Sequence, residues 1–160
     1  MPLYTNTEKG TVAYSPGTIN ASLLLANDQV NATQTLASIP DFKLAVAANE
    51  RISFRYNLFA LWDSDADIKY QIDIPAAPTK FFTITQGSDG SGTAVGQGPI
   101  TAEAEQNLTT ASANGLLIIH GFLDNGANAG HIDFQFSMRA GGGTSKTTIQ
   151  RGSYLEYIKF

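Results

Sequence analysis

Apolar and polar residues alternate along most of the chain, which is the period-two pattern of β-strands that bury one face. The clearest example places Ile52, Phe54, Tyr56 and Leu58 on one side of an extended segment and polar residues on the other. The residues between such runs are rich in Asn, Asp, Gly and Pro, which favour turns. The predicted strands lie at 29–36, 42–46, 50–62, 67–75, 80–86, 115–123, 131–138 and 152–160.

About eight short strands at this spacing predict an all-β fold, a β-sandwich for which jelly-roll topology is favoured. A chain of 160 residues fits one such domain. Helical periodicity is weak, and residues 101–113 are the one candidate helix, with a loop as the alternative. Glycine-rich segments at 87–99 and 140–146 are interpreted as mobile loops, because neither has the ending or the setting of a phosphate-binding loop.

Residues 1–20 differ from the sandwich domain predicted at 21–160. Their apolar positions are short islands, Leu3 with Tyr4 and Val12 with Tyr14, and a Pro-Gly break follows. We interpret the segment as an extended arm that needs another surface to lie on. The alternatives are an ordinary first strand and a frayed terminus.

Two predicted strands are apolar on both faces, at residues 57–62 and 116–123. A sandwich strand usually exposes one face to water, so a second apolar face predicts a cover. The cover is either a loop of the same chain or a neighbouring subunit, and we favour the subunit. The expected interface residues are Phe59, Leu61, Leu117 and Ile119.

Composition excludes several functions. The net charge is −4 and no basic stripe is present, which argues against nucleic-acid binding. The absence of cysteine excludes thiolate chemistry. No apolar run approaches the roughly 20 residues of a membrane span, and residues 1–10 do not resemble a signal peptide. We therefore expect a soluble protein that stays in the cytoplasm where it is made.

No catalytic or metal-binding motif is complete. Asp63, Asp65 and Asp67 begin like a calcium loop, but Ile68 and Ile74 occupy the positions that require Gly and Glu. A solvated turn explains these acids.

The other candidate catalytic residues also lack the motif that their chemistry would require. His120 and His131 lack a nucleophile motif, and Glu103 and Glu105 lack the aromatic neighbours of a sugar-cleaving site. The sequence thus predicts no enzyme, no metal and no cofactor.

Several segments together resemble a family of structural proteins of tailed bacteriophages. The family motifs are an "AAN-x-x-(Y/I)-x-F" strand, an "aDIK(Y/F)-x-(I/V)-x-x-P" step, a "G-(F/T)-(L/I)-x-N-G-x-x-A-G" hairpin and a "G-S-(Y/W)-(L/M)" ending. The resemblance extends over residues 35–160. The matching residues are Ala47, Ala48, Asn49, Ile52 and Phe54; Ala66 to Tyr70 with Pro75; Gly121 to Phe136; and Gly152 to Leu155.

The resemblance implies a virion component with a small β-sandwich that often forms trimers. We expect a capsid decoration (cement) protein on the capsid surface, with itself and the major capsid protein as partners. One alternative is a tail-fibre, spike or head-fibre subunit, although the chain has no heptads or repeats for a shaft. Another is a carbohydrate-binding adsorption module that uses Trp62, Tyr154 and Tyr157, although their positions on strands fit the core or an interface equally well.

Overall fold

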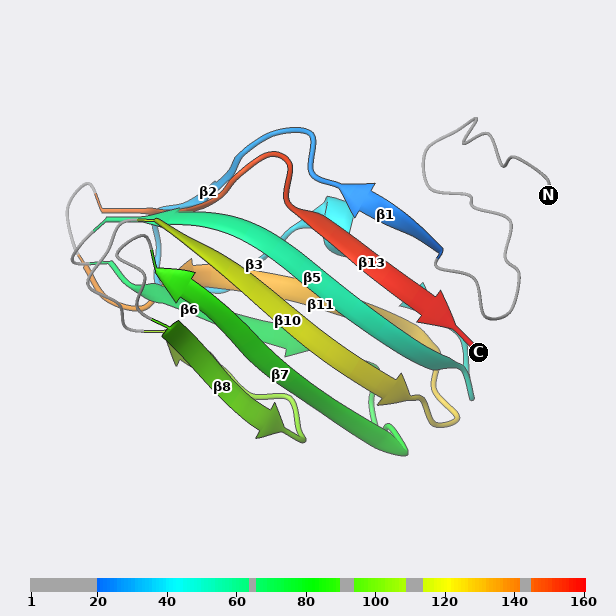
Figure 1. The fold of residues 1–160 in the computed structure, drawn as a ribbon. Coiled ribbons are helices and arrows are strands. Elements are labelled where there is room, and N and C mark those ends of the chain that lie inside the picture. The colour runs from blue at the N-terminus through cyan, green and yellow to red at the C-terminus, as the bar shows by residue number, and fades with distance from the viewer. Residues whose placement is uncertain (1–19, 64–65, 90–93, 109–113, 142–144) are drawn as a thin grey trace.

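The computed structural model of the chain describes residues 20–63, 66–89, 94–108, 114–141 and 145–160. Two antiparallel sheets pack face to face, which confirms the all-β sandwich (Figure 1). The larger sheet contains β1 (Asn20–Leu24), β2 (Gln29–Asn31), β5 (Arg51–Trp62), β7 (Lys80–Asp89), β8 (Ala94–Ile100), β10 (Asn114–Asp124), β12 (Thr147–Ile149) and β13 (Tyr154–Lys159). The smaller sheet contains β3 (Ala37–Ser38), β4 (Leu44–Val46), β6 (Ile68–Asp73), β9 (Gln106–Leu108) and β11 (Gly130–Met138).

The chain crosses repeatedly between the two sheets. The larger sheet has the order β1-β13-β5-β10-β7-β8, with β12 also pairing with β5 and with β2. The smaller sheet has the order β3-β11-β6-β9, with β4 also pairing with β11. Apart from the consecutive strands β7 and β8, neighbouring strands are therefore distant in sequence, as in interleaved Greek keys. This order favours the jelly roll, which stays an interpretation.

The core lies between the sheets and is centred on aromatic rings. The alternation predicted for β5 is confirmed, because Ile52, Phe54, Tyr56 and Leu58 are all buried. The Tyr56 ring packs against Phe54 of its own sheet at 5.7 Å and against Phe134 of the opposite sheet at 5.5 Å. Such edge and tilted ring contacts stabilise the core beyond the burial of apolar area.

A buried hydrogen bond also joins the sheets. The Tyr70 hydroxyl of β6 pairs with Thr85 Oγ1 of β7, and both side chains are buried. Burial raises the pKa of Tyr70 to about 12, because the phenolate would lose its hydration. Burial likewise raises the pKa of Tyr56, whose hydroxyl donates to the Phe42 carbonyl at 3.3 Å.

The glycine-rich segment 87–99 is not simply a loop, and this expectation was wrong. It contributes the end of β7 and most of β8, which pair with each other. A Cβ at Gly87 would lie 2.0 Å from the Leu116 carbonyl oxygen, so glycine allows β7 and β10 to approach closely. In the former helix candidate, residues 101–108 contain only the short strand β9. Residues 109–113 lie outside the described chain.

Candidate assembly surface

Residues of two motifs meet at one end of the sandwich, where they join a pair of turns. Asn49 has a left-handed φ of 58° and donates its backbone N–H to the Gly126 carbonyl at 2.8 Å. The Asn125 side chain donates to the carbonyls of Ala47 and Asn128, at 2.8 and 2.7 Å. These hydrogen bonds satisfy turn groups that would otherwise lack partners, so these motif residues have a structural role.

The closing motif forms a turn that completes the pairing of β5. The first half of β5 pairs with β13 and its last residues pair with β12, so Phe59 lies where the partner strand changes. There the Phe59 N–H donates to Ser153 Oγ at 2.9 Å, and the Phe59 carbonyl accepts from the Gln150 N–H at 2.8 Å. Gly152 has a φ of 85°, which side-chain-bearing residues rarely adopt.

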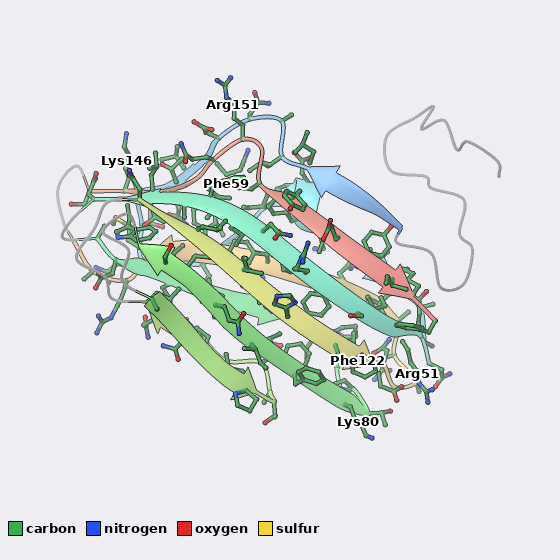
Figure 2. All side chains as sticks on the ribbon, in the orientation of Figure 1. Arg51, Phe59, Lys80, Phe122, Lys146 and Arg151 are labelled. Carbon is green, nitrogen blue, oxygen red and sulfur yellow. The ribbon has the colours of Figure 1, made fainter. Side chains whose placement is uncertain are left out.

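The outer face of the larger sheet carries apolar side chains across β13, β5, β10 and β7. Ile158, Phe122 and Phe82 belong to one cross-strand row, and the rings of Phe82 and Phe122 stack with centroids 5.9 Å apart. Nearer the other end of the face, Phe59 is the cross-strand partner of Leu116. Figure 2 labels Phe59 on β5 and Phe122 on β10 toward opposite ends of this face.

Exposed hydrophobic side chains concentrate on this face, which we call the apolar face. Among the residues whose exposure the structure describes, Phe160 at the C-terminal end is the one large exposed hydrophobic residue that does not lie on this face. The exposed fraction of the large hydrophobic residues on this face runs from 36% for Leu116 to 62% for Leu24, far above the exposed fraction of core residues. A concentration of exposed apolar side chains on one face is typical of an interaction surface. Its exposed members are Leu24, Val30, Phe59, Phe82, Ile84 and Leu116.

Polar groups lie in the middle rows of the apolar face. Arg55 forms an ion pair with Glu156 across β5 and β13, with 2.6 Å between Nη2 and Oε2. His120 is the cross-strand neighbour of Arg55 on the other side. Arg55 Nε and Asn57 Nδ2 are buried and have no hydrogen-bond acceptor in the described part of the chain. Unpaired buried donors are costly, and they call for a partner group.

The expected interface residues divide between the two faces of the larger sheet. Phe59 and Leu61 lie on the apolar face, as expected. Leu117 and Ile119 have no exposed surface and belong to the core, so their assignment to a subunit interface was wrong. Their register explains the error, because Leu117 pairs with the buried Leu58. The outward side chains of β10 are Leu116, Ile118 and Phe122 instead.

The arm residues Leu3, Tyr4, Val12 and Tyr14 lie outside the described residues. The described chain begins at Asn20, the first residue of β1, and β1 pairs with β13. The predicted arm and its boundary with the sandwich therefore stay predictions.

An open depression borders the apolar face beside the Phe59 ring. Asn27, Asp28, Gln150 and Arg151 line it together with that ring. The Asp28 carboxylate accepts from the backbone N–H of Arg151 at 2.7 Å, which fixes the two connecting loops relative to each other. The depression thus combines an exposed ring with amide and charged groups.

The aspartates that resemble a calcium loop have other roles. Asp63 accepts from the backbone N–H of Lys146 at 2.8 Å, and Asp67 forms an ion pair with Arg139 at 3.1 Å. Asp65 lies outside the described residues. Across the described ranges, no three His, Asp or Glu side chains gather as a metal site would require.

The remaining titratable groups form no catalytic arrangement in the described chain. His120 is exposed on β10 of the larger sheet, and His131 is exposed on β11 of the smaller one. Glu103 lies beside Asp73 on the outside of the smaller sheet and accepts a hydrogen bond from Gln71 at 2.6 Å. Partial burial and then the Asp73 carboxylate raise the pKa of Glu103.

The aromatic residues proposed for sugar binding are not all accessible. Trp62 is only 2% exposed and lies in the core, the alternative to sugar binding for this residue, so it cannot stack on a sugar. Tyr157 packs partly buried against the core, and Tyr154 is partly exposed on the outer face of β13.

No protein-family model matches the chain, and no curated protein matches it. Among solved structures, it is similar to a mutant VP2 protein of infectious bursal disease virus in derived T=1 particles, with a TM-score of 0.23 and 12% identity. A VP2 subviral particle of the same virus gives a TM-score of 0.21 and 12% identity. The alignments cover 99% of this chain but only 43% and 44% of the VP2 chains, less than half their length. Such low scores assign neither fold nor function.

Within the described residues, no helix is both long and apolar enough to cross a membrane.

Proposed function

We propose that the protein is a non-enzymatic structural component of a bacteriophage virion, a decoration protein that binds the head shell as a trimer. The apolar face is the observation that carries this proposal, because it is an extended surface suited to contact with protein. The motif resemblance gives that contact its setting in a phage particle. The proposal places the protein on the capsid surface, with the major capsid protein as its partner.

The rigid sandwich supports a structural role for a physical reason. A surface holds its shape when its strands are fixed by ladders and turns, and this face spans strands with continuous cross-strand pairing. The motif turns at Asn125 and Gly152 fix the ends of those strands. Residues with the strongest family resemblance thus support the scaffold rather than a reaction.

Attachment through the N-terminal arm is the finer part of the proposal. An arm that adds a strand to a partner gains backbone hydrogen bonds, although ordering it has an entropic cost. Three arms around one axis raise the local concentration of each, so weak contacts together give firm attachment. Leu3, Tyr4, Val12 and Tyr14 are the proposed contact residues.

Particles prepared without the protein provide the test. We expect the full chain to bind them with a copy number comparable to that of the shell subunits, measured by quantitative mass spectrometry. A variant that lacks residues 2–17 should remain folded, with a nearly unchanged Tm, but fail to bind. Equal binding of the truncated chain would contradict arm attachment, and only a few copies per particle would indicate a tail or fibre protein.

A second candidate function is glycan binding during adsorption. The depression beside Phe59 favours it, because an aromatic ring next to amide and charged groups suits a sugar. Glycan-array binding that is lost in Phe59→Ala and Arg151→Ala would support this function over decoration.

A further inference from the structure

We infer that the apolar face is where copies of this chain pack against one another, so that its occupant is a second copy. This inference deepens the proposed function and rests on its trimer, for which it names the shared surface. Four observations support it: the exposed area, the pairing of charges, the buried donors and the contrast with the smaller sheet.

The exposed area is about what a stable contact between subunits needs. With roughly 200 Å² for a large side chain, the six exposed members of the face present on the order of 500 Å² of apolar surface. A standard interface buries about 800 Å² per partner, of which somewhat more than half is apolar. The partly buried Ile118, Phe122 and Ile158 add to this area. The face is therefore large enough to hold a copy without help from another surface.

The charges on the face are arranged so that it can meet itself. Arg51 is paired with Asp124 at 3.3 Å, and Arg55 is paired with Glu156 at 2.6 Å, both within the face. A copy that approaches this face therefore finds these two cations already neutralised by neighbouring anions, which reduces the repulsion between like charges. A highly charged partner would gain little from such a surface.

The outer face of the smaller sheet is less suited to contact between copies. On this outer side Asp73 is the cross-strand neighbour of Asp133, which is buried and paired with Lys43 at 3.9 Å, and Glu103 lies beside Asp73. Two copies joined through that side would bring further carboxylates together in a less polar environment, which is unfavourable. This contrast assigns the contact between copies to the larger sheet.

Two buried donors of the face have no acceptor in the described chain, as is also true of Trp62 Nε1 in the core. These two donors, Arg55 Nε and Asn57 Nδ2, lie in the middle rows of the face. A second copy would bring acceptor oxygens of its own face, among them the Gln86 amide and the Glu156 carboxylate. A small side-chain rotation on assembly would then satisfy donors that one chain leaves unpaired.

The test is the mass of the purified full chain at micromolar concentration, measured by light scattering and sedimentation. We expect the wild type to have the mass of more than one chain, with three chains per particle if the copies share the face around a threefold axis. Ile84→Glu and Leu116→Glu each place a charge at an exposed position of the face, so they should reduce the mass to that of one chain. Ala45→Glu is the matched control, because it adds the same charge at an exposed position of the smaller sheet. Circular dichroism must show that all three variants are folded.

The outcomes separate this inference from the proposed function. A folded wild-type monomer, or face variants that keep the full mass, would overturn the inference. A wild-type monomer that associates only after residues 2–17 are removed would also overturn it, because the chain's own arm would then be the occupant. Two chains instead of three would support the shared face while contradicting the trimer. Face variants that are monomeric but still bind particles would support the shared face and leave capsid attachment intact.

Discussion

The backbone N–H of Phe59 donates to the hydroxyl oxygen of Ser153 at 2.9 Å, at the point where β5 exchanges β13 for β12 as its partner. Neither β12 nor β13 pairs with β5 at this position. The hydroxyl of Ser153, in the turn between those two strands, therefore accepts the hydrogen bond from Phe59. The hydroxyl is fully buried, and the Phe59 ring above it is 41% exposed. The Ser153 side chain thus links the turn between β12 and β13 to one end of the apolar face.

Replacement of Ser153 by alanine should lower stability by about 1–2 kcal/mol, because it leaves a partly buried N–H without an acceptor. For a chain of this size the corresponding loss in Tm is roughly 2–8 °C. Urea unfolding followed by circular dichroism measures the change. Ser88→Ala, at an exposed position of β7, should change stability by no more than about 0.5 kcal/mol. Equal losses in the two variants would contradict the assigned role of Ser153.

The adjacent leucines of β10 should respond very differently to truncation. Leu117 has no exposed surface, whereas Leu116 is 36% exposed on the apolar face. Leu117→Ala should therefore cost about 2–5 kcal/mol, and Leu116→Ala less than about 1 kcal/mol. Urea unfolding at a concentration low enough to keep every variant monomeric gives the comparison. A larger loss for Leu116→Ala would place the wrong side of β10 in the core.

This pair also shows where sequence reasoning succeeded and where it failed. The pattern showed that β10 is apolar on both faces, and it identified β5, β6 and β11 with their buried sides. It did not show which side of β10 is inward, because Leu116 and Leu117 are chemically identical. That choice depends on the register between Leu117 and Leu58, residues far apart in the sequence.

Strand β8 was missed for a related reason. Gly96, Gln97 and Gly98 have low strand propensity, so the segment was interpreted as a loop. Its strand structure comes from pairing with β7, and a close approach of β10 requires Gly87 in the same region. Likewise, the role of Ser153 depends on a change of partner strands that local pattern does not encode.

Replacement of Glu103 by glutamine should raise stability slightly at pH 7. The pKa of Glu103 is raised by partial burial and by Asp73, so the folded state favours the protonated carboxyl. This contribution is present below the unfolded pKa of about 4.3 and is lost as the pH rises through the folded pKa. The amide mimics the protonated form, and we expect a gain in Tm of about 1–2 °C at pH 7.

The same variant should show no gain at pH 3.5, where the wild-type Glu103 is itself largely protonated. Glu105→Gln is the matched control, because Glu105 pairs with Lys69 at 3.3 Å and its neutralisation should give no gain. Thermal unfolding of both variants at the two pH values measures the effect. A gain for Glu103→Gln that does not depend on pH would argue against carboxylate repulsion as its cause.

The buried tyrosines should make the fold sensitive to alkali. Burial raises the pKa of Tyr70 to about 12 and also raises that of Tyr56, so folding favours the neutral phenols. Their contribution is complete below the unfolded pKa of about 10 and is lost as the pH rises through the folded values. The wild-type free energy of unfolding should therefore fall steadily above about pH 10. Urea unfolding between pH 8 and 11.5 measures this slope.

Replacement of Tyr70 by phenylalanine separates the two effects of its hydroxyl. At pH 8 the variant should be less stable by about 1–3 kcal/mol, because buried Thr85 Oγ1 loses its partner. Above pH 10 its stability should fall less steeply than that of the wild type, because one titrating phenol is gone and Tyr56 remains. If Tyr70→Phe keeps the wild-type slope, the Tyr70 phenol ionises without opening the core, and the contact between β6 and β7 is looser than the structure indicates.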